Sequence, residues 1–106
     1  MIDTEKVVAE INKQIKENKI ILYMKGTPSL PQCGFSAQAV NKLRSCGQKF
    51  AFVNILENPD IRAILPTVHD WPTFPQLYID GELIGGCDII CEMHDDGELQ
   101  QLISEL

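Results

Sequence analysis

The chain has 106 residues, of which 44% are hydrophobic, and its 15 acidic and 9 basic side chains give a formal net charge of -6. This length suits one domain over residues 1–106 with a real core and leaves no room for a second. No basic cluster could neutralise a run of phosphates, which argues against nucleic acid as a partner. The longest apolar run, residues 20–24, is too short to span a bilayer, and the N-terminus lacks a signal-peptide pattern. We therefore expect a cytoplasmic protein with no membrane segment.

The first half of the chain predicts alternating helices and strands. Apolar residues at helical spacing begin after Asp3 and Thr4, which are candidate N-caps, and a continuous apolar run then favours a buried strand. Gly47 stands where a helix C-terminal cap is expected. The expected elements are a helix up to about residue 17, a strand over 19–25, a loop over 26–32, a helix from 33 to Gly47, and a strand over 50–55.

The second half predicts a short helix, a hairpin and two closing helices. Pro59 is suited to a helix start, and Pro66 is expected to limit that helix. Asp80-Gly81 supplies the positive φ angles of a tight turn between strands over 77–79 and 83–84. Asp88 is the expected cap of the next helix, and Gly97 separates it from a final amphipathic segment over 99–106.

This order of elements predicts an α/β fold. The strand–helix–strand unit of the first half is expected to be a parallel crossover, and the hairpin adds an antiparallel pair. We therefore expect a four-stranded mixed sheet flanked by helices.

Four cysteines, at positions 33, 46, 87 and 91, are the main candidates for chemistry. Cys33 follows a proline-punctuated loop and begins a helix, where unpaired backbone N–H groups favour the thiolate. Ser36 occupies the position of the second thiol that a dithiol oxidoreductase needs, and its alcohol cannot close a disulfide. Cys33 is thus a candidate nucleophile or metal ligand, with inert packing as the alternative.

Three segments carry a resemblance to a known family. Tyr23 to Pro28 leads to Cys33-Gly34-Phe35-Ser36, Trp71 to Gln76 follows, and Gly85-Gly86-Cys87-Asp88 comes last. With the order of elements, these segments resemble the monothiol glutaredoxins of the Cys-Gly-Phe-Ser class, which have the thioredoxin-like fold. The match runs from about residue 5 to the C-terminus.

The resemblance implies a glutathione site at one edge of the sheet. Two cations would bind the glycyl carboxylate, a cis-proline would turn the preceding backbone toward the tripeptide, and a helix N-terminus would receive the γ-glutamyl end. The residues so implied are Lys25, Arg62, Thr73, Phe74, Pro75, Gly86, Cys87 and Asp88.

The resemblance also implies a [2Fe–2S] cluster as cargo, held by Cys33 of two subunits and the thiolates of two glutathiones, because such a cluster needs four ligands. The family pattern is a homodimer with the cluster and a monomer without it, which hands the cluster to apo iron–sulfur proteins and pairs with BolA-like proteins. The alternative is an enzyme, a glutathione-dependent thiol transferase that uses Cys33 alone.

The remaining candidates have weaker functional interpretations. Cys87 would lie near the glutathione site, so a disulfide with Cys33 is one hypothesis, and simple packing is the other. Cys87, Cys91 and His94 form a poor zinc pattern, because a closed site needs four ligands. We expect Cys46 and Cys91 to belong to the core, His69 and His94 to be surface or capping groups, and Trp71 to pack before Pro72.

Overall fold

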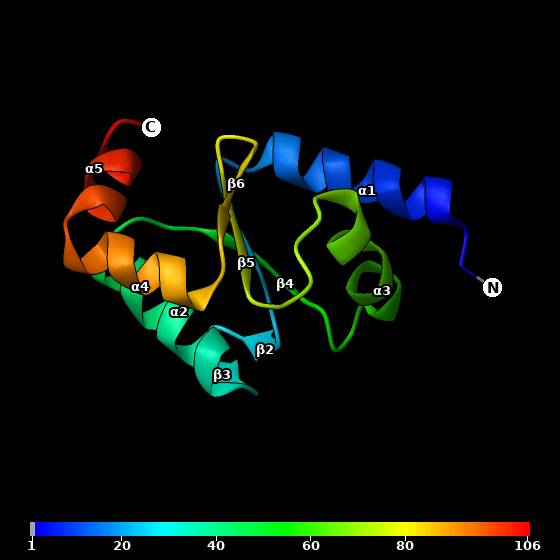
Figure 1. Ribbon diagram of the computed structural model, residues 1–106, viewed down its shortest axis with the longest axis horizontal. Helices are drawn as coiled ribbons and strands as arrows, with labels where there is room; N and C mark the ends of the chain where they lie inside the picture. Colours follow the sequence, from blue (N-terminus) through cyan, green and yellow to red (C-terminus); the bar gives the residue numbers. More distant parts are fainter. Residues whose placement is uncertain (1) are drawn as a thin grey trace.

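The structure, a computed structural model, describes residues 2–106 (Figure 1). Its elements, in chain order, are α1 (Thr4–Glu17), β1 (Ile20–Met24), β2 (Gly26–Thr27), β3 (Leu30–Pro31), α2 (Gly34–Ser45), β4 (Ala51–Asn54), α3 (Pro59–Val68), β5 (Gln76–Ile79), β6 (Glu82–Gly85), α4 (Cys87–Asp95) and α5 (Glu98–Ser104). Within this described part, no helix is both long and apolar enough to cross a membrane.

Four strands form one mixed sheet in the order β4-β1-β5-β6. Strand β1 is parallel to β4 and antiparallel to β5, and β5 is antiparallel to β6. This confirms the predicted four-stranded mixed sheet. Strands β1 and β5 are the two central strands. Because they are antiparallel neighbours, the segment that follows β1 and the segment that precedes β5 lie at the same end of the sheet.

Helices cover both faces of the sheet, with α2, α4 and α5 on one side and α1 and α3 on the other (Figure 1). All five residues of β1 are buried, since alternate side chains enter opposite cores. Leu22 packs into the core formed with α2, α4 and α5, whereas Tyr23 packs into the core formed with α1 and α3. A continuous apolar run is therefore expected for a strand that is buried on both faces of the sheet.

Several local predictions are confirmed by the backbone. Asp80 and Gly81 have φ values of 52° and 83°, as a two-residue hairpin turn requires. The N–H of Gly47 donates to the carbonyl of Arg44 just after the C-cap of α2. Gly97, with φ 86°, separates α4 from α5.

The predicted loop over 26–32 contains a small antiparallel hairpin, β2–β3. Gly26 makes this hairpin feasible, because its φ is +91° and an added Cβ would lie 2.6 Å from the carbonyl oxygen of Leu30. The Gly26 N–H donates to Asn54 Oδ1 at 2.9 Å, which attaches the hairpin to the end of β4. No pattern in the sequence indicated so short a pairing.

Two predicted helix boundaries are wrong. Helix α3 continues past Pro66 to Val68, because a proline in the last turn removes a single backbone donor and the helix ends soon afterwards. Asp88 does not cap α4: the N-cap is Gly86, no side chain caps this end, and Asp88 lies in the first turn. A carboxylate in the first turn is still stabilised by the helix dipole, although it accepts no hydrogen bond from the first N–H groups.

Candidate functional site

One pocket of about 670 Å³ opens beside the N-termini of α2 and α4. All nine site residues expected from the sequence line it, although they come from five separate parts of the chain. They are Lys25, Cys33, Arg62, Thr73, Phe74, Pro75, Gly86, Cys87 and Asp88. The fold therefore brings together residues that the sequence separates by as many as 63 positions, from 25 to 88.

Cys33 is the N-cap residue of α2 and keeps extended backbone angles, φ -153° and ψ 137°. Its thiol is half-buried and lines the pocket. The pKa of this thiol is lowered, chiefly by the backbone N–H of Ser36, with further contributions from the N–H of Phe35 and the charge of Lys25. Partial burial opposes the shift without reversing it. The helix start thus favours a thiolate at Cys33, as the sequence predicted.

Ser36 has a structural role in this site. Its side chain is fully buried, and its Oγ accepts a hydrogen bond of 3.1 Å from the backbone N–H of Lys25. This bond joins the end of β1 to the first turn of α2. The residue that replaces a resolving thiol therefore helps to hold Lys25 and Cys33 in one place.

Lys25 and Arg62 give the pocket a positive region. The ion pairs found within residues 2–106 involve Lys42, His94 and Asp95, so neither pocket cation is neutralised by a carboxylate of the described chain. Arg62 is exposed, and Lys25 is half-buried. Two unneutralised cations at one pocket can bind an anionic group such as a carboxylate.

The opposite wall is the segment that precedes β5. The Phe74–Pro75 peptide bond is cis, as the resemblance implied for Pro75. Gln76 is fully buried, and its Nε2 donates to the carbonyl oxygens of Trp71 and Thr73 at 2.9 and 3.2 Å. The Tyr78 hydroxyl in turn donates to Gln76 Oε1 at 2.8 Å. These hydrogen bonds fix the backbone of the segment that forms this wall.

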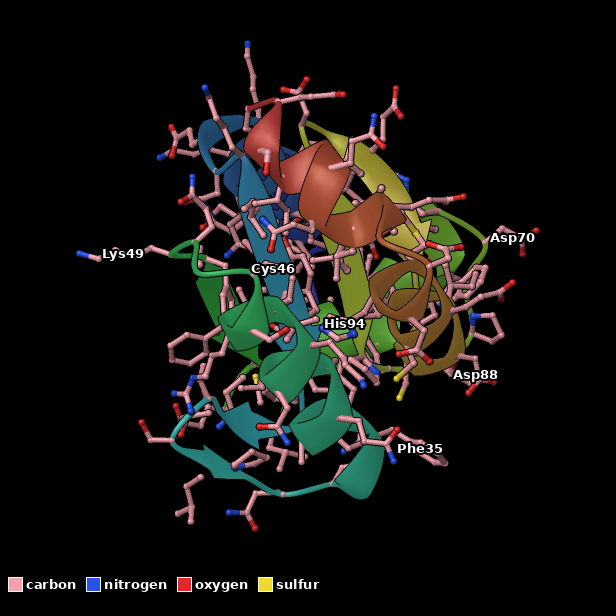
Figure 2. All side chains as sticks on the ribbon, turned by 90° about the vertical axis from the view of Figure 1, so that its left-hand side faces the viewer. Phe35, Cys46, Lys49, Asp70, Asp88 and His94 are labelled. Carbon is pink, nitrogen blue, oxygen red and sulfur yellow. The ribbon has the colours of Figure 1, made fainter. Side chains whose placement is uncertain are left out.

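The N-terminus of α4 closes the third side. A Cβ on Gly86 would lie 3.2 Å from the carbonyl oxygen of Pro75, so glycine allows the helix start to approach the wall closely. No side chain caps this helix end, which leaves its N–H groups available to an anion. In Figure 2, Asp88 at the start of α4 and Phe35 at the start of α2 project outward on the same side of the molecule.

Sequence reasoning missed several lining residues. The most informative is Trp71, which was expected only to pack: it lines the pocket, and its Nε1 is buried without a hydrogen-bond partner in the described structure. Phe35, 60% exposed, also lines the pocket, with Pro66, Pro72 and Ile89. A buried unpaired donor is uncommon, and this one belongs to a residue of the pocket wall.

The other thiols and histidines differ in part from expectation. Cys46 packs against the core, but Cys91 lies at a surface groove and was wrongly expected in the core. His94 is half-buried, and its Nε2 lies 2.7 Å from Ser45 Oγ. His69 is the C-cap residue of α3, as expected of a capping group, and it is half-buried with its ring centroid 5.2 Å from that of Tyr78. In residues 2–106, no three His, Cys, Asp or Glu side chains gather as a metal site.

Fold and site define a thioredoxin-fold protein with a single activated thiol at the first sheet-to-helix turn. The glutaredoxin family model matches residues 20–84. Glutaredoxin 4 of Escherichia coli K12 is 65% identical over 98 residues, which cover 92% of this chain and 85% of that protein. Glutaredoxin 4 of Buchnera aphidicola from Acyrthosiphon pisum is 66% identical over 97 residues, or 92% and 90% of the two chains.

Solved structures agree with the sequence relatives. Reduced poplar apo GrxS14 matches with a TM-score of 0.80 and 47% identity over 93% of this chain and 91% of its own. A buckwheat glutaredoxin–glutathione complex matches with a TM-score of 0.84, but at 22% identity, over 96% and 91%, it supports the fold alone. The chain belongs to the glutaredoxin family. Because Ser36 replaces the second active-site thiol, it is a monothiol member.

Proposed function

We propose that the pocket binds glutathione. The charges of the tripeptide match the pocket: Lys25 and Arg62 for the glycyl carboxylate, the uncapped start of α4 for the γ-glutamyl carboxylate, and Asp88 for its ammonium. Thr73 and Phe74 would pair with the tripeptide backbone as an added strand, and Pro75, Gly86 and Cys87 would shape the contact surface.

With glutathione bound, the protein would carry a [2Fe–2S] cluster as cargo between apo iron–sulfur proteins. The observation that carries this proposal is that Cys33, with its lowered pKa, faces the same pocket as the unneutralised cations, and Ser36 offers it no disulfide partner. Thiolate is the ligand that such clusters take, and four are needed. One Cys33 and one glutathione from each of two copies make four.

Anaerobic reconstitution with iron, sulfide and glutathione tests the proposal. The wild-type protein should turn brown and elute at twice the monomer mass, and it should lose both properties without glutathione. Cys33→Ser should stay colourless and monomeric, whereas Cys46→Ser, which changes a thiol outside the pocket, should behave as wild type. A wild type that stays colourless under these conditions would contradict the proposal.

A glutathione-dependent thiol transferase is the second candidate, and the lowered pKa of Cys33 favours it too. The Cys33 thiolate would attack the glutathione sulfur of a protein mixed disulfide and release the protein thiolate. A second glutathione thiolate would then attack the Cys33–glutathione disulfide, giving oxidised glutathione and free Cys33. Rapid turnover of such a substrate by a protein that takes up no cluster would place this activity first.

Partners other than glutathione follow from the family pattern. The cluster-loaded form is proposed to be a homodimer and the apo form a monomer, with BolA-like proteins and apo iron–sulfur proteins as further partners. Phe35 and Leu30, 60% and 67% exposed on either side of Cys33 in the sequence, offer apolar surface for such contacts. Co-elution of cluster-loaded protein with an apo iron–sulfur acceptor, followed by cluster appearance on the acceptor, would test this part.

A further inference from the structure

Helix α4 carries a second pair of sulfur atoms that the proposed function does not use as a pair. Cys87 and Cys91 are one helical turn apart, and their Sγ atoms lie 3.9 Å from each other. Both thiols are within hydrogen-bond range of one acceptor, Gln38 Oε1 on α2, at 3.4 and 3.6 Å. The side-chain amide of Gln38 on α2 thus contacts both sulfurs on the same side of α4.

The pair can be reached from two sides. Cys87 lines the glutathione pocket, whereas Cys91 lines a separate groove between α2 and α4. That groove is also lined by Gln38, Asn41, Lys42, Ser45 and His94. In Figure 2, His94 lies between the α2 and α4 ribbons on this face. An ion could therefore approach Cys91 even when the glutathione pocket is filled.

We propose that Cys87 and Cys91 form a two-thiolate site for a soft monovalent metal ion, with Cu(I) as the representative. Thiolate sulfur is the ligand type that selects such ions. If each metal–sulfur bond is about 2.3 Å, as in zinc thiolates, sulfurs 3.9 Å apart give an S–metal–S angle of about 116°. Two-coordinate binding of such an ion is nearly linear, so the sulfurs would each move apart by a few tenths of an ångström, toward about twice the bond length.

Other uses of the pair fit the geometry less well. A structural zinc site needs four ligands, and residues 2–106 offer no cluster of even three candidate side chains. A disulfide needs sulfurs about 2.05 Å apart, so both would have to move toward each other within the first turns of the helix. A soft ion with two thiolate ligands needs only a small separation of the sulfurs.

Charge favours a cation on the groove side of the pair, because Lys25 and Arg62 line the pocket on the other side. Asp88 and Glu92 follow the two cysteines directly in α4, and the chain as a whole has a net charge of -6. The one cation lining the groove, Lys42, has its Nζ 3.7 Å from Asp95 Oδ1. On binding, each thiol loses its proton to solvent and forms one sulfur–metal bond, and the oxidation state of the metal does not change.

Competition with a chromophoric Cu(I) chelator, under anaerobic conditions and without glutathione, tests this site. The parent is Cys33→Ser, because Cys33 is itself a thiolate ligand. It should remove one Cu(I) per chain from the chelator. Adding Cys91→Ser should lower the Cu(I) affinity by at least about 100-fold, because one of two ligands is lost. Adding Cys46→Ser instead should leave the affinity unchanged, since Cys46 lies outside the pair.

A second measurement does not depend on the folding of a Cys91 variant. In alkaline solution, where Cys87 reacts, Cu(I) bound to the Cys33→Ser protein should slow alkylation of Cys87 and Cys91 together, as mapped by mass spectrometry, and leave Cys46 unaffected. Equal Cu(I) affinity with and without Cys91, or protection of only one of the two thiols, would overturn the proposal. A Cys33→Ser protein that takes no Cu(I) from the chelator would overturn it as well.

Discussion

Removal of the Ser36 hydroxyl tests whether this side chain supports the site through a hydrogen bond. In Ser36→Ala the part-buried N–H of Lys25 loses its acceptor, Ser36 Oγ, now 3.1 Å away. An unsatisfied buried donor costs about 1–3 kcal/mol, so we expect the free energy of unfolding to fall by about 2 kcal/mol. The entropy of unfolding for 106 residues is about 0.22 kcal/mol/K, which makes this a drop of about 9 °C in Tm.

Thermal and urea unfolding under reducing conditions, followed by circular dichroism, measure this effect. Ser104→Ala is the matched control, because Ser104 is exposed and its Oγ donates only to the Gln100 carbonyl of its own helix. We expect that control to stay within about 0.5 kcal/mol of wild type. The reasoning is refuted if the two variants are equally stable.

Ser36→Ala also tests the causes of the lowered pKa of Cys33. The pKa of the Cys33 thiol should rise in Ser36→Ala, because the Ser36 side chain helps to lower it. The pKa should nevertheless remain below the value of an ordinary thiol. The largest cause, the backbone N–H of residue 36, is retained by alanine. The pH dependence of the alkylation rate of Cys33 gives this value. A midpoint at or above that of a free thiol would show that the backbone contribution is wrongly assigned.

Three further predictions concern other parts of the site. Alkylation of Cys33 should reach half its maximal rate at a pH below that of a free thiol. Cys87, whose pKa is raised by burial to about 11, should react only in strongly alkaline solution. Equal midpoints for the two thiols would contradict this. Trp71→Phe should weaken glutathione binding about 5- to 10-fold in calorimetry without loss of stability, because it removes an unpaired donor from a residue that lines the pocket. Gly26→Ala should destabilise the fold by more than about 2 kcal/mol, and Gly34→Ala, where the added Cβ meets nothing, by less than about 0.5 kcal/mol; comparable denaturation midpoints would argue against the steric reasoning.

Local chemistry made much of the fold predictable. The apolar run of β1, the Asp80-Gly81 turn and the helix break at Gly97 each depend on a few neighbouring residues, and each is confirmed. Most of the nine pocket residues were predicted by a different route, from a family resemblance that also implied Arg62 outside the three matched segments, and the structure places all nine around one pocket. Their binding of glutathione stays a prediction.

The two wrong helix boundaries have different physical causes. Pro66 was expected to limit α3, and Asp88 to cap α4, because both residue types have strong local preferences. In the structure, one lost backbone donor near the end of α3 is tolerated, and α4 has its N-cap at Gly86, beside the Pro75 carbonyl, two residues before Asp88.

The sequence by itself determined the order of elements, the buried central strand and the presence of a single thiol at a helix start without a resolving partner. Only the tertiary structure decided that the Trp71 N–H is buried without a partner in the pocket wall, that Ser36 joins β1 to α2, and that Cys87 and Cys91 share one acceptor on α2. The reason is that hydrophobic period and turn chemistry act over a few residues, whereas the partner of a buried polar atom depends on which distant segment packing brings beside it.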